Sequence, residues 1–456
     1  MADLKKNDEI VVDIVDTGFK GEGIAKVDGL TIFIPDLLTG EKAKIKLLKV
    51  NKTIAYGKLI ELLEKSQYRQ KVDCSTYDKC GGCSMRHIKY YHTLKMKEQA
   101  LDITLQKELG HTVKINKCVK MEEPFYYRNK LSFPVGTQEV DGKEQVICGV
   151  FSERSHRIIE TKDCLIQNEV AQKIIKDIIK FANENDISGY DEEKNLGLLR
   201  HIVIRVGNST KQIMVTLVLT NMKLPYEKEL VNMLVKKYPK IRTIAKNVND
   251  KITNVILGDK TKIIYGDGYI IDYLKEFKFK ISPLSFYQVN SIQTEKLYTK
   301  AVEYAELTGK ETVFDLYCGI GTIGIFASKK IKKLIGIETV PDAIKDAKEN
   351  AKLNDIKHAE FHVGDVENIL PKLVKEKKLK ADVVFLDPPR KGCEKVVLET
   401  LLKVKPQRIV YVSCNPATLA RDLKILEKKY DIIECTPVDQ FCYSPHIESV
   451  TKLVLK

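Results

Sequence analysis

Cys414 is the residue of this chain whose type and position best suit covalent chemistry. It lies in the run Val-Ser-Cys-Asn-Pro, directly after the apolar stretch 408–413, which predicts a buried strand. In an open α/β sheet, ligands bind beyond the carboxyl ends of the parallel strands. A cysteine at that edge can act as a nucleophile, whereas the alternative for a lone free cysteine is a small hydrophobic core residue. The motifs around it favour the nucleophile.

A glycine-rich loop predicts a cofactor site in the same part of the chain. The run 312–316 reads as a strand that enters Gly-Ile-Gly-Thr-Ile-Gly at 319–324 and opens a helix. Glycines there let the backbone approach a ligand, and an acidic residue about 20 positions later can bind ribose hydroxyls. Glu338 stands at that spacing, at the end of the next strand. A nicotinamide cofactor site would share these features.

A further strand over 381–386 delivers Asp387 ahead of Pro388 and Pro389, which fix an extended turn at the edge of the sheet. This motif looks like the substrate-facing signature of S-adenosylmethionine methyltransferases. The members that act on exocyclic amino groups usually carry an aromatic residue after the prolines. Arg390 stands there in this chain, which argues against amino-group methylation.

Three closely spaced cysteines predict a second, separate site. Cys74, Cys80 and Cys83 form C-x5-C-G-G-C, and the glycines between them allow the tight loop of zinc knuckles and sulfur clusters. Three thiolates need a fourth ligand to close a tetrahedral site. Spacing alone leaves zinc and iron–sulfur equal, and the candidates for the fourth ligand are Cys118, Cys148 and Cys164.

The elements that position these residues fall into distinct regions. Up to about residue 62, short alternating runs with glycine turns predict an OB-like β-barrel or another small β-module. A helical stretch follows the cysteines through about Leu109, and an α+β region extends to about residue 285. From there, alternating strands and helices predict a doubly wound parallel sheet, with one helix starting at Ser291.

The α+β region contains two basic segments. The segment 125–133 interleaves aromatics with Arg128 and Lys130, and Arg200 and Arg205 stand in an apolar run. Aromatic side chains combined with cations suit single-stranded nucleic acid. A solvated strand face with core aromatics is the equal alternative for each segment.

Composition is consistent with a polyanionic partner inside a cell. The formal net charge of the 456 residues is +14 and the isoelectric point is near 9.0. No apolar stretch approaches the roughly 20 residues that span a bilayer, and the first residues lack the apolar core of a signal peptide. Eleven cysteines in such a chain indicate metal or catalytic roles rather than disulfides. We therefore expect a cytoplasmic protein with no membrane contact.

Together, the motifs resemble the RNA (uracil-5-)-methyltransferase family over essentially the whole chain. The resemblance rests on Gly-Ile-Gly with Glu338, the Asp-Pro-Pro-Arg motif, the run from Ser413 to Asp422, and His-Ile-Glu-Ser-Val at 446–450. It implies a TRAM barrel over 1–62, a central domain over 63–284 that contains an iron–sulfur cluster and binds RNA, and a Rossmann-like S-adenosylmethionine methyltransferase domain over 285–456.

The resemblance also implies a role for each site residue. Cys414 would add to C6 of uracil, Glu448 would remove the C5 proton, and Asp387 would lie between the methyl donor and the base. For cofactor binding it implies Gln288, Tyr317, Glu338 and Asp387; Asp365 is either near the adenine or an ordinary loop residue. Cys164 matches the distant fourth ligand of a [4Fe-4S] cluster with Cys74, Cys80 and Cys83, and we expect that cluster to be structural.

The expected substrate is a specific uridine of 23S ribosomal RNA, because family members with a TRAM domain and a cluster usually act there. A base must leave its stack to reach a thiolate, which predicts base flipping. A tRNA uridine methyltransferase is the alternative, and a noncatalytic RNA-binding protein is a further one. A radical methylthiotransferase would need C-x3-C-x2-C, which this sequence lacks. No obligate protein partner is inferred.

Overall fold

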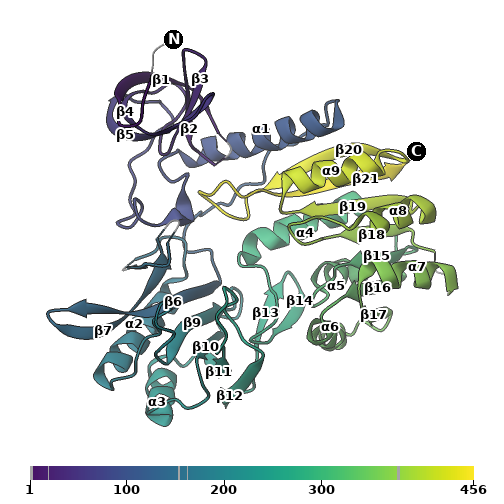
Figure 1. The fold of residues 1–456 in the computed structure, drawn as a ribbon. Coiled ribbons are helices and arrows are strands. Elements are labelled where there is room, and N and C mark those ends of the chain that lie inside the picture. The colour runs from purple at the N-terminus through teal and green to yellow at the C-terminus, as the bar shows by residue number, and fades with distance from the viewer. Residues whose placement is uncertain (1–3, 19, 153–154, 162, 377–379) are drawn as a thin grey trace.

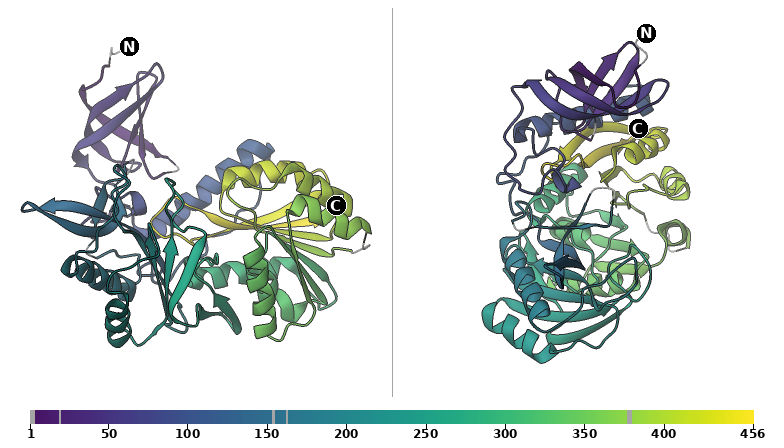
Figure 2. Two further views of the ribbon diagram at one scale, coloured as in Figure 1. Left: turned by 60° about the horizontal axis from the view of Figure 1, so that its bottom comes forward. Right: turned by 60° about the vertical axis from the view of Figure 1, so that its left-hand side comes forward.

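A computed structural model describes residues 4–18, 20–152, 155–161, 163–376 and 380–456. An N-terminal barrel, a central α+β part and a C-terminal α/β part follow one another along the chain (Figure 1). The C-terminal part lies beside the other two (Figure 2), and each part has its own cluster of buried apolar residues.

The N-terminal strands close into a barrel, as the glycine-separated runs predict. Alternate residues point inward, so that Ile32, Ile34 and Ile45 are fully buried in its core. Gly57 faces this core, where an added Cβ would lie 3.0 Å from the Ile45 side chain. The strand order is β1-β2-β3-β5-β4, formed by β1 (Glu9–Thr17), β2 (Gly23–Val27), β3 (Leu30–Ile34), β4 (Lys42–Val50) and β5 (Ile54–Glu64).

A second sheet with two helices forms the central part. Its order is β12-β11-β10-β9-β6-β7-β8, and its apolar residues pack against α2 and α3. The elements are β6 (Lys130–Val140), β7 (Lys143–Phe151), β8 (Ile158–Glu160), α2 (Glu169–Glu184), β9 (Leu199–Val206), β10 (Ile213–Leu219), α3 (Glu227–Lys237), β11 (Ile241–Val248) and β12 (Lys260–Gly266).

The two arginines of β9 are buried, so the interpretation of this segment as a nucleic-acid surface is wrong. Arg200 and Arg205 are each 3% exposed. Arg200 lies over the Tyr190 ring and donates to the backbone carbonyl of Asn249 at 2.6 Å. Arg205 donates to the carbonyl of Ser285 at 2.9 Å. Both guanidinium groups therefore hold loops together instead of facing solvent.

Helix α1 (Tyr90–Leu109) follows the cysteine loop with its short helix η1 (Gly81–Cys83). Although α1 precedes the central sheet in sequence, its Leu101, Leu105 and Leu109 share a core with the C-terminal part. Figure 1 shows α1 alongside α9 and β20. Apolar residues at i, i+4 spacing thus attach an N-terminal helix to a domain that begins almost two hundred residues later.

The C-terminal sheet has the order β17-β16-β15-β18-β19-β21-β20. The strands β17, β16, β15, β18 and β19, neighbours in that order, pair in parallel, as predicted. Strands β21 and β20 form an antiparallel hairpin that extends the sheet beyond β19. The hairpin matters for the site, because antiparallel pairing sets Ser449 near the start of β21 opposite Ser413 at the end of β19. Glu448 is thereby brought to the edge where Cys414 lies.

Helices cover both faces of this sheet, and a small hairpin joins it to the central part. Helix α4 begins at Ser291, as predicted. The elements are β13 (Ile270–Leu274), β14 (Phe277–Ile281), α4 (Ser291–Ala305), β15 (Thr312–Leu316), α5 (Thr322–Ala327), η2 (Ser328–Lys330), β16 (Lys333–Glu338), α6 (Pro341–Leu353), β17 (Ala359–Val363), α7 (Val366–Glu376), β18 (Val383–Leu386), α8 (Lys395–Val404), β19 (Arg408–Ser413), α9 (Pro416–Leu426), β20 (Tyr430–Val438) and β21 (Glu448–Leu455).

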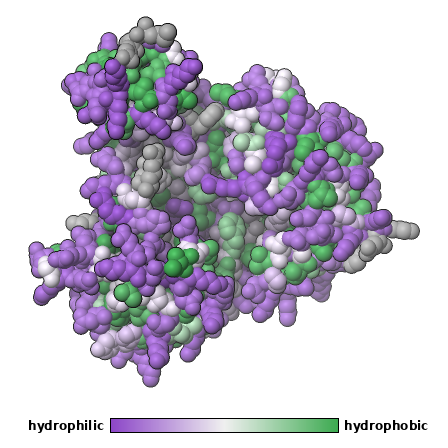
Figure 3. Space-filling view, viewed as in Figure 1, coloured by the Kyte–Doolittle hydropathy of each residue, from purple (hydrophilic) through white to green (hydrophobic). Residues whose placement is uncertain are grey.

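Hydrophilic residues dominate the face in Figure 3, and apolar ones gather on the barrel, where Val11 and Val15 are each 53% exposed. Across the described residues, no helix combines the length and the apolar character needed to cross a bilayer.

Candidate active site

A cavity of about 1180 Å³ opens at the carboxyl ends of the parallel strands. This is the edge at which open α/β sheets bind ligands. The cavity brings together all the predicted catalytic and cofactor residues, each from a different segment of the chain: Gln288, Tyr317, Glu338, Asp365, Asp387, Cys414 and Glu448.

Cys414 stands between the end of β19 and the start of α9, so local structure fixes its backbone. The side-chain oxygen of Asn415 caps α9 by accepting from the N–H of Ala417 at 3.1 Å, and Pro416 occupies the first turn. The Asn415 amide also donates to the carbonyl of Arg390 at 3.1 Å. The loop that contains Asp387 is therefore tied to the loop that contains the thiol.

Two acidic side chains and one cation surround the thiol. Burial, together with Glu448 and Asp387, raises the pKa of Cys414 to about 11, while Arg390 opposes this shift. The half-buried thiol is therefore protonated at neutral pH in the free protein. A cationic ligand among these carboxylates would favour the thiolate.

Glu448 is 5% exposed and begins β21. Burial, with the nearby charge of Asp387, raises the pKa of Glu448 to about 8. Arg390 and Lys97 oppose this shift. A carboxyl group whose pKa lies near neutrality can accept a proton in one step and release it in the next.

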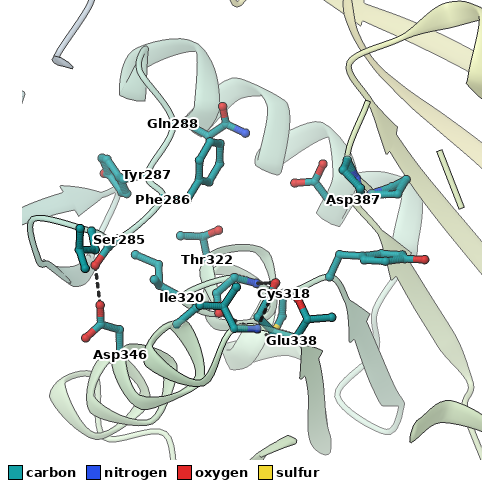
Figure 4. Close-up of a pocket in the computed structure, with 18 of the residues that line it drawn as sticks. Ser285, Phe286, Tyr287, Gln288, Cys318, Ile320, Thr322, Glu338, Asp346 and Asp387 are labelled. Atoms are coloured by element: carbon teal, nitrogen blue, oxygen red, sulfur yellow. Dashed lines mark hydrogen bonds between the residues drawn. The ribbon is translucent and has the colours of Figure 1, made fainter. Parts of the chain in front are cut away.

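Asp387 follows β18, and its N–H donates to the carbonyl of Leu316. Burial raises the pKa of this carboxyl to about 7. Figure 4 shows the carboxylate facing the cavity, across from Phe286 and Gln288. The side chain is therefore available to a ligand on the cavity side.

The glycine loop is shaped by close contacts. Glu338 accepts from the N–H of Gly319 at 3.1 Å and from the N–H of Val340 at 3.0 Å, which fixes the carboxylate at the cavity floor. Gly324 lies so close to Leu334 that an added Cβ would be 2.6 Å from that side chain. The glycine at 324 is therefore required by the packing of α5 on the sheet.

Tyr317 lines the cavity, but its hydroxyl points away from the predicted ligand. Its backbone has φ +66°, and its ring packs in the core formed with α8 and α9. Burial and the neighbouring Cys393 thiol raise the pKa of Tyr317. The Tyr317 hydroxyl itself is buried and has no hydrogen-bond partner among the described residues.

The loop 282–290 forms the opposite wall. The Asn129 amide donates to the carbonyl of Gln288 at 2.9 Å, so the central sheet supports this wall. On the other side, Ser285 donates to Asp346 at 2.5 Å, as the dashed line in Figure 4 shows. Phe286 is 70% exposed and lines the cavity.

Sequence reasoning gave no role to several residues at the site. Asp315 is fully buried beneath the glycine loop, where it accepts from the N–H of Gly324 at 2.9 Å, and burial raises its pKa to about 7. A lone acid inside an apolar strand run was a readable signal. Arg390 and His446, which lie 3.0 Å apart at the cavity, gave no such signal because their pairing is tertiary.

The four cysteines predicted as ligands converge away from this cavity. Burial and the nearby Cys164 thiol raise the pKa of Cys83 to about 12. Burial also raises the pKa of Cys164, with Cys80 and Cys74 adding to the shift. Within the described ranges, however, no group of three His, Cys, Asp or Glu side chains is arranged to hold a metal ion.

The other two candidates for a fourth ligand have different neighbours. Cys118 lies near Asp439 and Lys97, and Cys148 lies within β7 near Glu160. The structure therefore groups Cys164 with the C-x5-C-G-G-C loop.

Comparison with protein families assigns both ends of the chain. Residues 196–456 match the tRNA (uracil-5-)-methyltransferase family, and residues 4–60 match the TRAM domain. Uncharacterized RNA methyltransferases of Halalkalibacterium halodurans and Clostridium acetobutylicum are 46% and 47% identical to this chain. The alignments cover 100% and 98% of this chain, and 99% and 97% of those proteins.

A solved structure resembles the whole chain. The tRNA (uracil-54, C5)-methyltransferase of Pyrococcus abyssi, in complex with S-adenosyl-L-homocysteine, superimposes with a TM-score of 0.79 at 30% identity. The alignment covers 97% of this chain and 99% of that one, so the predicted order of barrel, central part and methyltransferase fold is shared.

Proposed function

The chain belongs to the tRNA (uracil-5-)-methyltransferase family and contains a TRAM domain, and from this premise we propose that it methylates C5 of a uridine in 23S ribosomal RNA. The methyl donor would be S-adenosylmethionine. The observation that carries the proposal is the convergence of Cys414, Glu448 and Asp387 in one cavity. Those residue types at that edge suit a covalent route to an unreactive ring carbon.

Cys414 would begin the reaction. Uracil C5 is a weak nucleophile, so the thiolate would add to C6, and the electron pair of the C5–C6 bond would move toward the O4 carbonyl. The resulting enolate makes C5 electron-rich. S-adenosylmethionine, when bound, would supply the methyl group that C5 accepts, and the electron pair of the broken S–CH3 bond would stay on the sulfur of the leaving S-adenosylhomocysteine.

Glu448 would complete it. The added methyl group leaves one proton on C5, and the carboxylate would remove that proton as the general base. The electron pair of the C5–H bond would re-form the C5–C6 double bond, and the Cys414 thiolate would leave with the pair of its C–S bond. The product is 5-methyluridine, Cys414 is returned as the thiolate, and Glu448 keeps the C5 proton until it passes to water.

The methyl donor fits the wall and floor of the same cavity. Gln288, Tyr317, Glu338 and Asp387 line it, together with Asp365. Glu338 would accept from ribose hydroxyls. The carboxylates of Asp387 and Glu448 would offset the positive charge of a sulfonium. Their position beside the thiol therefore favours a cationic ligand there.

The TRAM domain and the grouped cysteines favour ribosomal RNA by family resemblance. A tRNA uridine is the second candidate, favoured by the likeness to the Pyrococcus abyssi tRNA enzyme.

We also propose a [4Fe-4S] cluster on Cys74, Cys80, Cys83 and Cys164. Thiolates are the usual ligands of such clusters, and the thiols influence one another's ionisation. Cys83 and Cys164 pack around the buried Tyr443 and Cys442. The cluster would therefore brace the junction between the central and C-terminal parts. We propose in addition that the domains span 1–62, 63–284 and 285–456 and that the protein is cytoplasmic.

Labelled S-adenosylmethionine and unmodified RNA test the proposal directly. The protein would be incubated with 23S ribosomal RNA in one arm and with bulk tRNA in the other, and 5-methyluridine would be mapped by mass spectrometry. Label at C5 of a ribosomal uridine is expected. Label in tRNA alone would select the second candidate, while label on a nitrogen, or in neither RNA, would refute uridine C5 methylation.

A further inference from the structure

Lys97 is a buried cation on α1, outside the cavity. Its side chain is 2% exposed and ion-paired with Asp439, with 2.5 Å between Nζ and Oδ1. The same ammonium donates to the backbone carbonyl of Phe441 at 3.0 Å. One side chain from the N-terminal half of the chain thus holds two points of the segment 439–446, between β20 and β21.

The partner carboxylate is held from further sides. The Tyr90 hydroxyl donates to Asp439 Oδ2 at 2.6 Å and accepts from the N–H of Met121 at 2.9 Å. The Gln293 amide on α4 donates to the Asp439 carbonyl at 3.2 Å. The segment therefore has a fixed start, anchored to both α1 and α4.

This segment leads straight into the cavity. Phe441, His446 and Glu448 all line it, and the Phe441 and His446 rings meet edge to face at 5.8 Å. A displacement at residues 439–441 would therefore be transmitted to the general base within a few residues.

The chemistry of the pair argues that it does more than stabilise the fold. Removing two charges from water costs roughly as much as their attraction returns, so apolar residues of the same size would serve stability equally well. An ion pair adds geometric specificity, because an ammonium that donates to both a carboxylate and a carbonyl fixes the positions of both acceptors.

We propose that Lys97 is a positioning residue for Glu448: its ammonium fixes the segment 439–446, and thereby the placement and charge of the general base. This inference rests on the proposed function for the role of Glu448.

The charges around Glu448 support this role. Asp387, at the end of β18, raises the pKa of Glu448, whereas Arg390 and Lys97 lower it. Cys414, just after β19, and Tyr298 on α4 are near the same carboxyl group. Of these two cations, Lys97 is buried, so solvent screens its electrostatic effect on Glu448 less than that of Arg390.

The test compares Lys97→Met with Lys246→Met. Lys246 is a matched control, because it is 4% exposed, donates to the carbonyl of Met222 at 2.6 Å and pairs with Glu227, but lies in the central sheet. Hydrogen–deuterium exchange over 439–446 and the pH profile of single-turnover 5-methyluridine formation would be measured on the full-length protein. The exchange arm needs no activity, so a failure of the proposed function would be recognised separately.

Lys97→Met is expected to speed exchange over 439–446 and to move the acidic limb of the pH profile upward by about one unit. Below that limb the ionised fraction of Glu448 falls about tenfold per unit, so the rate at pH 7 falls about tenfold. Lys246→Met should change neither readout, and Lys97→Arg should restore both.

Either of two results overturns the inference: exchange equal to that of Lys246→Met, or faster exchange with an unmoved limb. If Lys97→Met does not fold because Asp439 is left unpaired, the double variant Lys97→Met/Asp439→Asn removes both charges and answers the same question. Its limb should still shift upward, and an unmoved limb in this folded variant overturns the inference as well.

Discussion

The cavity at Cys414 and the site of four cysteines use the same side chain in opposite surroundings. In both, burial raises a thiol pKa. Around Cys414 the neighbours are the carboxyls of Glu448 and Asp387 and the cation of Arg390, whereas around Cys83 they are mainly other thiols. A single thiol beside a proton acceptor can add to a substrate and leave again, while grouped thiols can share a bound group.

The difference teaches that function here follows from the neighbours more than from the thiol. Both regions are built from distant segments, but the Cys414 cavity opens to ligands at a sheet edge. Two of the four cysteines, Cys83 and Cys164, instead pack against the buried Tyr127 and Tyr443. Substitutions in the two regions should therefore fail in different ways.

Cys414→Ala should have the largest effect. Loss of the nucleophile should lower 5-methyluridine formation by more than about 10⁴-fold, since catalytic groups that act as a unit fail together. RNA that contains 5-fluorouridine should form a covalent adduct with the parent protein and none with the variant, measured by denaturing gel.

Cys435→Ala is the matched control, because Cys435 is fully buried in β20 and its thiol accepts from Thr451 Oγ1 at 3.1 Å. Adduct formation by Cys414→Ala would contradict the assignment of the nucleophile.

Glu448→Gln should give a smaller loss and a distinctive species. A general base contributes about 10²- to 10⁴-fold, and without it the C5 proton stays, so methylated RNA should accumulate bound to the protein. Mass spectrometry of nuclease-treated protein measures that species. Glu434→Gln on β20, whose carboxyl pairs with Lys114, is the control. Free product formed at the parent rate would exclude Glu448 as the base.

These two residues differ in how far sequence could place them. Cys414 follows an apolar run and precedes Asn-Pro, so strand, edge and helix cap are all local signals. Glu448 became a candidate by resemblance alone, because its position depends on how the β20–β21 hairpin pairs with β19. Antiparallel register between distant strands leaves no trace at the residue itself.

Charged residues in strands show the same limit. The pattern around Arg200 and Arg205 allowed either a nucleic-acid surface or a strand face, and both side chains turned out to be buried against backbone carbonyls. Likewise, the sequence predicted a helical stretch through about Leu109, but the partner of α1 is set by tertiary packing against α9 and β20. Sequence periodicity identifies the apolar face of a helix and not the surface that covers it.

Cys80→Ala should give a moderate effect of a different kind. If the four thiols hold a cluster that braces the central part, RNA affinity should fall about tenfold, and iron content and visible absorbance should fall with it, while S-adenosylmethionine binding persists. Filter binding, iron analysis and calorimetry measure these. Cys148→Ala is the control, since Cys148 lies in β7. Unchanged RNA affinity in Cys80→Ala would count against the bracing role.

Asp315→Asn should have the smallest effect, on stability alone. Burial raises the pKa of Asp315 from 3.8 to about 7, so the folded state is penalised as pH rises from about 4 to about 7. A pKa shift of about three units corresponds to a cost of about 4 kcal/mol for ionising Asp315 in the folded state. The Asp315→Asn variant would avoid this cost, but its amide N–H₂ would replace Asp315 Oδ1, which has no hydrogen-bond partner among the described residues, and leaving that N–H₂ unpaired would offset about half of the gain. Denaturant unfolding should therefore show a gain of about 2 kcal/mol at pH 8 and a loss at pH 4, while the exposed Asp13→Asn changes neither. A pH-independent difference would mean that burial does not hold the Asp315 carboxyl protonated in the folded state.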